Sequence, residues 1–313
     1  RHIKKSSGHL LATHEARFQF MNAHRNEFSI QRMASVLDVS CSGYYAWRRR
    51  GEHARVERTS VFDAAVREEF LRKKSRYGVR RIVTALRKRG IDCGRNRVAA
   101  SMRRQGLVVR HQRRFIATTD SKHSYKVSPN LLERHFSVDA PDTVWVSDIT
   151  YLRSAIGWLY LCVFIDLYSR KVVGWTVSTS LRHTTVVRAF KSAAWARRLC
   201  AGLIVHSDRG VQYCCDGFRK ILVPYGVTQS MSRKGDCWDN AVAESFFATL
   251  KKEMPHGHLF ASVADAQRYL FEYIELEYNN QRLHSTLGYR TPQEQEELYW
   301  STQRAAMDME QAA

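Results

Sequence analysis

The chain has 313 residues, of which 50 are Lys or Arg and 30 are Asp or Glu, and its hydrophobic fraction is 44%. This length allows two or three domains of ordinary size. The longest apolar run, Trp158 to Ile165, is far too short to cross a bilayer, and no signal peptide opens the sequence. No membrane partner is therefore expected.

The positive charge is concentrated in one part of the chain. Residues 1–135 contain 31 Lys and Arg against 11 Asp and Glu, whereas residues 136–313 contain 19 of each sign. A single basic cluster is usually a solvated surface. An excess of this size in one segment instead favours a polyanion partner, namely nucleic acid.

Cysteine spacing and the first residue bear on location and completeness. The seven cysteines form no Cys-x-x-Cys pair and have no zinc-finger spacing with the histidines. Their odd number favours reduced thiols and a cytoplasmic location. Because the chain starts at Arg1 and not at Met, we expect it to be the downstream part of a longer product.

Two helix-turn-helix patterns occupy the basic part. In the first, Ser29 can cap a helix that ends at Leu37, a turn follows at 38–40, and residues 43–47 lead into three arginines. In the second, a helix ends at Gly90, and a further helix carries arginines on its outer face. Helical hairpins are also common in plain bundles, so the DNA-binding interpretation depends on the arginines. Five of them are expected to contact DNA: Arg80, Arg81, Arg97, Arg103 and Arg104.

From about residue 140 the pattern changes to strands. Three β-branched and aromatic runs at 143–152, 158–166 and 171–178 predict two consecutive hairpins. Alternating helices and strands follow, which predicts an α/β layer fold with a mixed sheet. The further elements expected are a helix at about 183–199, a strand at 203–207, a helix at about 212–224, a short strand at 226–230, a helix through residue 244, and helices that open at Ser262 and Thr291.

Three acidic residues lie in telling positions within this second part. Asp148 lies inside an apolar strand, Asp208 directly follows the strand at 203–207, and Glu244 lies in a helix. A carboxylate in a buried strand is costly unless it is paired or binds a cation. Taken singly, Asp208 reads better as a turn-opening residue and Glu244 as a solvated one. Together the three predict a site for a hard metal ion and phosphoryl chemistry.

The first hairpin allows a register test for a fourth carboxylate. We expect Leu152 to pair with Trp158 across the turn. This register places Asp148 opposite Cys162 and puts Asp166 roughly 13 Å farther along the ladder, at about 3.3 Å per residue. Asp166 is then a turn-forming residue and not a third ligand.

Residues from about 140 to 292 resemble the catalytic core of the integrase-type DD(35)E transposases of bacterial insertion sequences. The matching segments occur in order, and 35 residues separate Asp208 from Glu244, which fits the name of the group. The segments are VWVSDITY (144–151), IDLYSRK (165–171), HSDRGVQY (206–213), DNAVAESFF (239–247) and YNNQRLH (278–284).

The resemblance implies an RNase H-like catalytic core, shared with retroviral integrases, behind an all-α helix-turn-helix region. It also implies a bacterial, nucleoid-associated protein that acts as a homo-oligomer on DNA, usually fused by frameshifting to a small upstream DNA-binding frame. No zinc module precedes the core, so metal is expected only at the acidic triad. The expected domains are a basic DNA-binding region at 1–107, a basic linker at 108–138, the catalytic core at 139–292, and a C-terminal helix and tail at 293–313.

The resemblance further implies that Asp148, Asp208 and Glu244 are the catalytic residues. They would hold two Mg²⁺ ions about 3.5–4 Å apart, for which Mn²⁺ could substitute. One ion would activate water or a DNA 3′-hydroxyl, and the other would stabilise the leaving oxygen. The first step nicks the element end, and in the second the exposed 3′-hydroxyl attacks another phosphodiester.

Three more basic residues near the triad are expected to contact DNA. Lys251 lies two helical turns beyond Glu244 on the same face. The resemblance supports a phosphate contact there, and an ordinary exposed lysine is the alternative. Arg233 and Lys234 precede Gly235 in a predicted mobile loop beside the site, where they either clamp DNA or are simply solvated.

The leading hypothesis is a transposase that cleaves and joins strands of double-stranded DNA at element ends and targets. An RNase H-like nuclease without strand transfer shares the triad but accounts less well for the basic helix-turn-helix region. A DNA-binding regulator of the element with an inactive or fragmentary core is the alternative of a different class. The three retained carboxylates argue against it.

Overall fold

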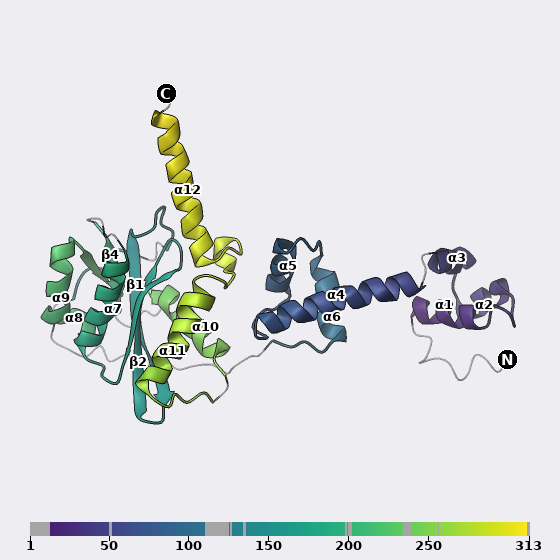
Figure 1. The fold of residues 1–313 in the computed structure, drawn as a ribbon, viewed down its shortest axis with the longest axis horizontal. Coiled ribbons are helices and arrows are strands. Elements are labelled where there is room, and N and C mark those ends of the chain that lie inside the picture. The colour runs from purple at the N-terminus through teal and green to yellow at the C-terminus, as the bar shows by residue number, and fades with distance from the viewer. Residues whose placement is uncertain are drawn as a thin grey trace. The chain divides into compact units, whose positions relative to one another are not determined.

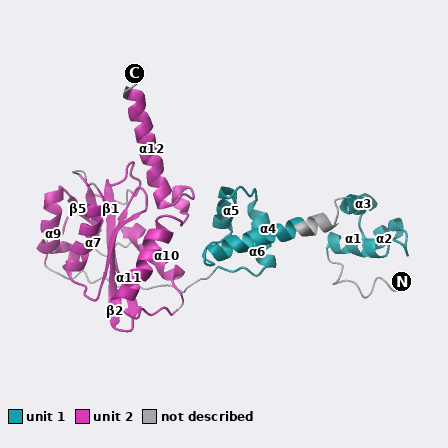
Figure 2. Cartoon of the chain, in the orientation of Figure 1, with its two compact units in different colours: residues 1–109 teal, residues 110–313 magenta. Residues whose placement is uncertain are grey.

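The computed structural model divides into two compact units, residues 1–109 and 110–313 (Figure 2). Among the described helices, none combines the length and the apolar character that a membrane span requires. For residues 52–57 and 311 only the backbone is described. The described residues are 13–49, 52–109, 125, 127–133, 136–197, 199, 202–233, 240–255 and 257–311.

The first helix-turn-helix is confirmed as a group of three helices, α1 (His14–Ala23), α2 (Ile30–Leu37) and α3 (Cys41–Arg49). Ser29 caps α2 by accepting a hydrogen bond from the backbone N–H of Arg32, and Asp38 ends it in the left-handed conformation. Tyr44 and Trp47 of α3 are buried among the three helices. Helix α1 was not predicted, because its apolar residues follow no clear helical period.

The second helix-turn-helix is also confirmed, and it consists of α5 (Val79–Lys88) and α6 (Arg95–Arg104). The chain leaves α5 through Gly90, whose φ of 79° is the left-handed conformation that favours glycine. Both helices pack on α4 (Glu52–Arg72), which the sequence analysis missed. The apolar faces meet through buried residues of all three helices: Phe62, Val66, Phe70, Ile82, Leu86, Val98 and Met102.

The second unit is built on the mixed five-stranded sheet that the sequence predicts. Strands β1, β2 and β3 form two antiparallel hairpins, and β4 and β5 run parallel to β1. The strand order is β3-β2-β1-β4-β5. The strands are β1 (Val144–Ser154), β2 (Gly157–Asp166), β3 (Val172–Ser178), β4 (Ile204–Ser207) and β5 (Thr228–Met231).

Helices cover both faces of this sheet (Figure 1). One face is covered by α7 (His183–Ala196), α8 (Val211–Cys214) and α9 (Asp216–Leu222), and η1 (Val223–Tyr225) follows α9. The other face is covered by α10 (Ala241–Glu253), α11 (Val263–Phe271) and the π-helical segment η3 (Glu272–Tyr278). The turn η4 (Ser285–Leu287) and helix α12 (Pro292–Gln311) complete the chain. The single helix predicted at 212–224 is wrong, because extended backbone at Cys215 separates α8 from α9.

Side chains along β1 alternate between the two helical layers. Trp145 packs with the α7–α9 layer, whereas Val144 and Val146 pack with the α10–α11 layer. By the same alternation, Ser147 faces α8 and Asp148 faces α10. Neighbouring residues of one strand therefore serve opposite faces of the sheet.

The expected register of the first hairpin is wrong by one residue. Ser154 pairs with Gly157 across a two-residue turn, and Gly157 has a φ of 107° that suits glycine. As a result Asp148 lies opposite Val163, and Asp166 lies opposite Trp145. Asp166 is then three ladder positions from Asp148, roughly 10 Å at 3.3 Å per residue. The shorter turn was missed because no Asn-Gly or Asp-Gly pair marks it.

Residues that the composition assigned to the linker pack against the open edge of the sheet. The Met231 backbone N–H of β5 donates to the Pro129 carbonyl at 3.2 Å, and the Leu131 N–H donates to Ser230 Oγ at 2.9 Å. Leu132 is buried in the core of the α10–α11 layer. Residues 110–124 of the predicted linker lie outside the described part of the chain.

Candidate active site

Parallel pairing of β1 and β4 brings the two aspartates together. Ser147 pairs with Ser207, and Asp148 and Asp208 directly follow these two serines in the chain. Asp148 and Asp208 therefore lie side by side, with Asp208 at the carboxyl end of its strand, where open α/β sheets bind ligands. Asp208 also opens a turn, because its Oδ1 accepts the Gly210 N–H at 2.9 Å. The turn-opening role and the site role are thus compatible.

Glu244 reaches the same place from the helical layer. It lies in the first turn of α10, which packs against β1 on the face toward which Asp148 points. Burial raises the pKa of the Asp148 carboxyl well above its usual range, and the negative charges of Asp208 and Glu244 raise it further. A 2.7 Å hydrogen bond from the Ile149 N–H and the charge of Lys251 oppose this shift. Glu244 is an exposed residue, but partial enclosure of its carboxyl group raises its pKa as well.

The three carboxylates fit a divalent metal by their chemistry. Within the described ranges, no three His, Cys, Asp or Glu side chains already form a cluster that could hold a metal ion. The donors are all hard oxygens, the type that Mg²⁺ and Mn²⁺ prefer. The mutual repulsion that raises the pKa of Asp148 is the condition that a dication would relieve.

Lys251 reaches toward the aspartates along the same face of β1. Its Nζ donates a 2.6 Å hydrogen bond to Thr150 Oγ1, two residues beyond Asp148. Burial lowers the pKa of Lys251 to about 8, and the charge of Asp148 opposes the shift. The side chain is therefore partly enclosed and lies on the same face of β1 as Asp148.

The basic loop after β5 begins beside the aspartates. Met231, the last residue of β5, pairs with Ser207 of β4, so Arg233 follows one residue beyond the level of Asp208. Arg233 is exposed. Lys234 lies outside the described residues.

The five arginines of the second helix-turn-helix fall into two groups. Arg104 forms an ion pair with Asp63 of α4 at 2.7 Å, and Arg97 lies over the Phe62 ring at 3.9 Å. Arg81 lies over the Tyr77 ring at 5.6 Å. Arg80 and Arg103 are exposed and have no partner among the described residues.

A buried polar cluster under the site was missed from the sequence. Ser147 Oγ and Tyr213 OH form a 2.9 Å hydrogen bond, and Asn240 Nδ2 donates to the Ser147 carbonyl at 3.3 Å. All three residues lie in segments that match the integrase-type core, but no spacing in the sequence indicates that they meet.

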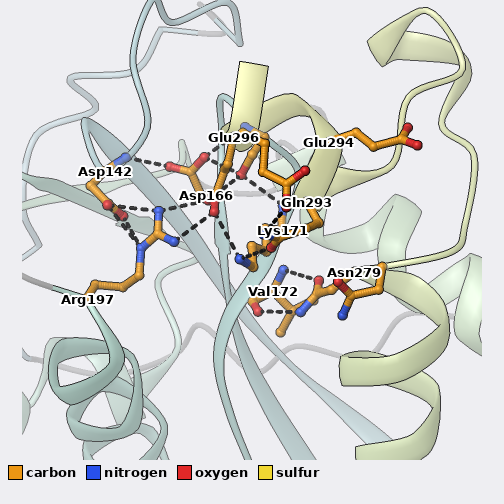
Figure 3. A network of polar contacts seen from close by, with 12 residues as sticks. Asp142, Asp166, Lys171, Val172, Arg197, Asn279, Gln293, Glu294 and Glu296 are labelled. Carbon is orange, nitrogen blue, oxygen red and sulfur yellow. Dashed lines mark hydrogen bonds and ion pairs between the residues drawn. The ribbon is translucent and has the colours of Figure 1, made fainter. Parts of the chain in front are cut away.

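A second acidic centre lies at the amino-terminal end of β1 (Figure 3). Arg197 forms a two-pronged ion pair with Glu296 at 2.8 and 3.0 Å and contacts Asp142 at 2.8 Å. Lys171 Nζ donates to Glu296 Oε2 at 2.9 Å, the oxygen that also accepts from Arg197 Nη1. Asp166 accepts the Asp142 and Ser169 N–H groups at 2.8 Å each, which agrees with its predicted turn-forming role.

Comparison with known proteins places this geometry in a family. Two models of an integrase core domain match residues 138–237 and 225–292, and a model of an HTH-like domain matches residues 57–115. Transposase InsF for insertion sequence IS3A of Escherichia coli (strain K12) is 42% identical over 280 residues, which cover 89% of this chain and 97% of InsF. The IS600 uncharacterized 31 kDa protein of Shigella sonnei is 39% identical over 267 residues, 85% of this chain and 98% of that protein.

A solved structure is also similar. The HTLV-2 integrase catalytic core domain in complex with magnesium (trimeric form) has a TM-score of 0.38 and 15% identity. The similarity covers 50% of this chain and 96% of that domain.

Proposed function

Because this chain belongs to the family of insertion-sequence transposases that includes InsF of IS3, we propose that Asp148, Asp208 and Glu244 form its metal-dependent active site. Cleavage at the element ends and transfer of the exposed 3′ ends to a target would both take place there. Two observations support this proposal: β1 and β4 are parallel neighbours, and α10 packs against β1.

One observation carries this assignment. Asp148 lies half-buried in a strand, and the charges of Asp208 and Glu244 add to the effect of burial in raising its pKa. A structural role would be expected to surround such a carboxylate with arginines or N–H donors, as the second acidic centre does. Among the described residues, the Ile149 N–H and Lys251 are the groups that lower the pKa of Asp148. The arrangement therefore suits a cation that arrives from solution with the substrate.

Each carboxylate would have a distinct part in this site. Asp148 and Asp208 would provide oxygens from the sheet, and Glu244 would complete the set from the exposed first turn of α10. When bound, Mg²⁺ or Mn²⁺ would neutralise charge on the scissile phosphate and activate the attacking water or 3′-hydroxyl. Lys251, enclosed between α10 and β1, would hold a non-bridging phosphate oxygen.

Basic residues in both units would hold the double-stranded DNA. Arg233 and Lys234 would contact DNA beside the site, and Arg80 and Arg103 would contact it from the helix-turn-helix. Arg97 and Arg104 already contact Phe62 and Asp63, which favours a role in packing α6 on α4. Arg81 has an intermediate position, because it lies over Tyr77 at the start of α5.

Two further properties are proposed without a structural observation of their own. The enzyme would act as a homo-oligomer, because two element ends must be joined in one reaction. It would work in the bacterial cytoplasm on the nucleoid, with or as part of a product that includes an upstream DNA-binding frame.

The test is a cleavage assay with a labelled duplex that carries the element end. The wild-type chain with Mg²⁺ should give nicks and longer joined strands on a denaturing gel. Asp148→Asn and Glu244→Gln should bind the duplex equally well and give neither product. Nicks without joined strands would favour the nuclease, binding without products would favour the regulator, and residual strand transfer by Asp148→Asn would exclude the assigned site.

A further inference from the structure

Three buried polar side chains connect the segments that carry the three carboxylates. Ser147 directly precedes Asp148, Tyr213 follows Asp208 by five residues, and Asn240 precedes Glu244 by four. The exposed fraction is 0% for Ser147, 1% for Tyr213 and 5% for Asn240. The Ser147 and Tyr213 hydroxyls bond each other and the Asn240 amide bonds the backbone of β1, so the three side chains connect these segments to one another.

Ser147 is the common partner of the other two. Its hydroxyl forms the 2.9 Å hydrogen bond with Tyr213 OH on the α8 side, and its carbonyl accepts from Asn240 Nδ2 at 3.3 Å. The Cys162 sulfur of β2 lies 3.9 Å from the serine hydroxyl. The Tyr213 carbonyl in turn accepts from Gln229 Nε2 of β5 at 2.7 Å. Strands β1, β2 and β5 and helix α8 are thus linked around one residue.

The Asn240 side chain does not form the hydrogen bond that is usual at its position. It is the N-cap of α10, where an asparagine side chain ordinarily accepts a hydrogen bond from the first turn. Here it makes no capping bond and donates to β1 instead. Its Oδ1 is buried without a hydrogen-bond partner among the described residues, which is costly. The contact fixes the start of α10, and with it the first turn that carries Glu244, against the strand of Asp148.

We infer that Ser147, Tyr213 and Asn240 are positioning residues that set the mutual spacing of Asp148, Asp208 and Glu244. The inference rests on the proposed function of the triad. Residues that orient metal ligands from behind are typically worth about 10- to 100-fold in metal affinity or activity. Breaking either contact of Ser147 should weaken metal binding while leaving all three carboxylates in place.

The experiment measures Mn²⁺ affinity of the full chain by calorimetry, without DNA, together with urea unfolding and the Mg²⁺-dependent cleavage rate. Tyr213→Phe and Asn240→Ala should each lower Mn²⁺ affinity by about 10- to 100-fold. Tyr273→Phe and Asn279→Ala are matched controls: the Tyr273 hydroxyl donates to Glu253 at the far end of α10, and Asn279 bonds the Val172 backbone. The controls should reduce stability but keep the Mn²⁺ affinity of the wild type.

Ser147→Ala removes the hydrogen bond between Ser147 and Tyr213 from the serine side. The double variant Ser147→Ala/Tyr213→Phe should lose no more Mn²⁺ affinity than the worse single variant, because both changes remove one hydrogen bond. Full affinity in Tyr213→Phe and Asn240→Ala, or an equal loss in the two controls, would overturn the inference. Asp148→Asn in the same titration separates the two proposals. If it retains the Mn²⁺ affinity of the wild type, the triad assignment itself fails.

Discussion

Two acidic centres include residues of the first hairpin of the second unit, and they are built in opposite ways. At the amino-terminal end of β1, Glu296 is held by Arg197 and Lys171, and these two cations keep its pKa below the usual range although burial opposes them. Asp148 lies on β1 three residues beyond Trp145, the residue that pairs with Asp166. Burial and the charges of Asp208 and Glu244 raise its pKa. Glu296 is neutralised by Arg197 and Lys171 in the first centre, and a bound cation would neutralise the charges in the second.

The difference separates a structural acid cluster from a chemical one. In the neutralised centre, Glu296 is 5% exposed and Arg197 14%, and the ion pair attaches helix α12 to the carboxyl end of α7. Removing one member of such a pair leaves an uncompensated buried charge. In the other centre, removing one carboxylate relieves repulsion. A substitution in the neutralised centre should therefore lower stability. Loss of a carboxylate in the other centre should lower activity without lowering stability.

The largest effect is expected from Asp208→Asn. Cleavage should fall by roughly four orders of magnitude, about 5 kcal/mol, because one oxygen donor to the metal is lost. The asparagine oxygen can still accept the Gly210 N–H, and a like charge is removed, so the free energy of unfolding should stay equal or rise. Cleavage rates and urea unfolding measure the two quantities, and a clear loss of stability would contradict the comparison.

The next effect is expected from Arg197→Ala in the neutralised centre. Glu296 would lose its two-pronged partner, and the free energy of unfolding should fall by about 3–5 kcal/mol. Arg268→Ala is the control, because its pair with Asp265 is 74% exposed on the arginine side and should contribute only ~0–1 kcal/mol. Equal losses in the two variants would show that burial of the pair is unimportant.

Metal addition should change the free energy of unfolding by an intermediate amount and should distinguish the two centres. At 100 times its dissociation constant, Mn²⁺ should stabilise the folded chain by about 2.7 kcal/mol, and EDTA should reverse this. Asp148→Asn should abolish the stabilisation, and Glu296→Gln should preserve it. Because the pKa values of Asp148 and Glu244 are raised, protons compete for these oxygens above the usual carboxylate range. The stabilisation should therefore weaken as the pH falls from neutral, well before ordinary carboxylates titrate.

The smallest effect concerns the lysine beside the proposed metal-binding acids. The pKa of Lys251 is lowered to about 8, so its charge is present below that pH and is lost above it. DNA affinity of the wild type should therefore decrease as the pH is raised through 8, with the salt dependence losing about one phosphate contact. Lys251→Arg stays charged and should show no such decrease. Parallel pH curves for the two proteins would exclude a phosphate contact by Lys251.

Features that depend on near neighbours in the chain were predictable. Ser262 accepts from the Asp265 N–H at 3.1 Å, and Thr291 and Glu294 form the reciprocal pair that opens α12. The strand pattern also led to the mixed sheet, and Asp148, Asp208 and Glu244 were identified as candidates. These signals are encoded within a few positions of the sequence or in a matching motif. The register of the first hairpin was not predicted, because the length of a turn without a marked glycine pair is ambiguous.

By itself, the sequence determined the family, the order of helices and strands, and three acidic residues of the proposed site. Only the tertiary structure decided that Asp148 faces its two acidic neighbours while Asp166, on the next strand, is held by backbone N–H groups. It alone joined Ser147 to Tyr213 and Asn240, and Arg197 to Glu296, across 66 to 99 residues of chain. Such contacts follow no periodicity, because they depend on which faces of the sheet and helices are buried together.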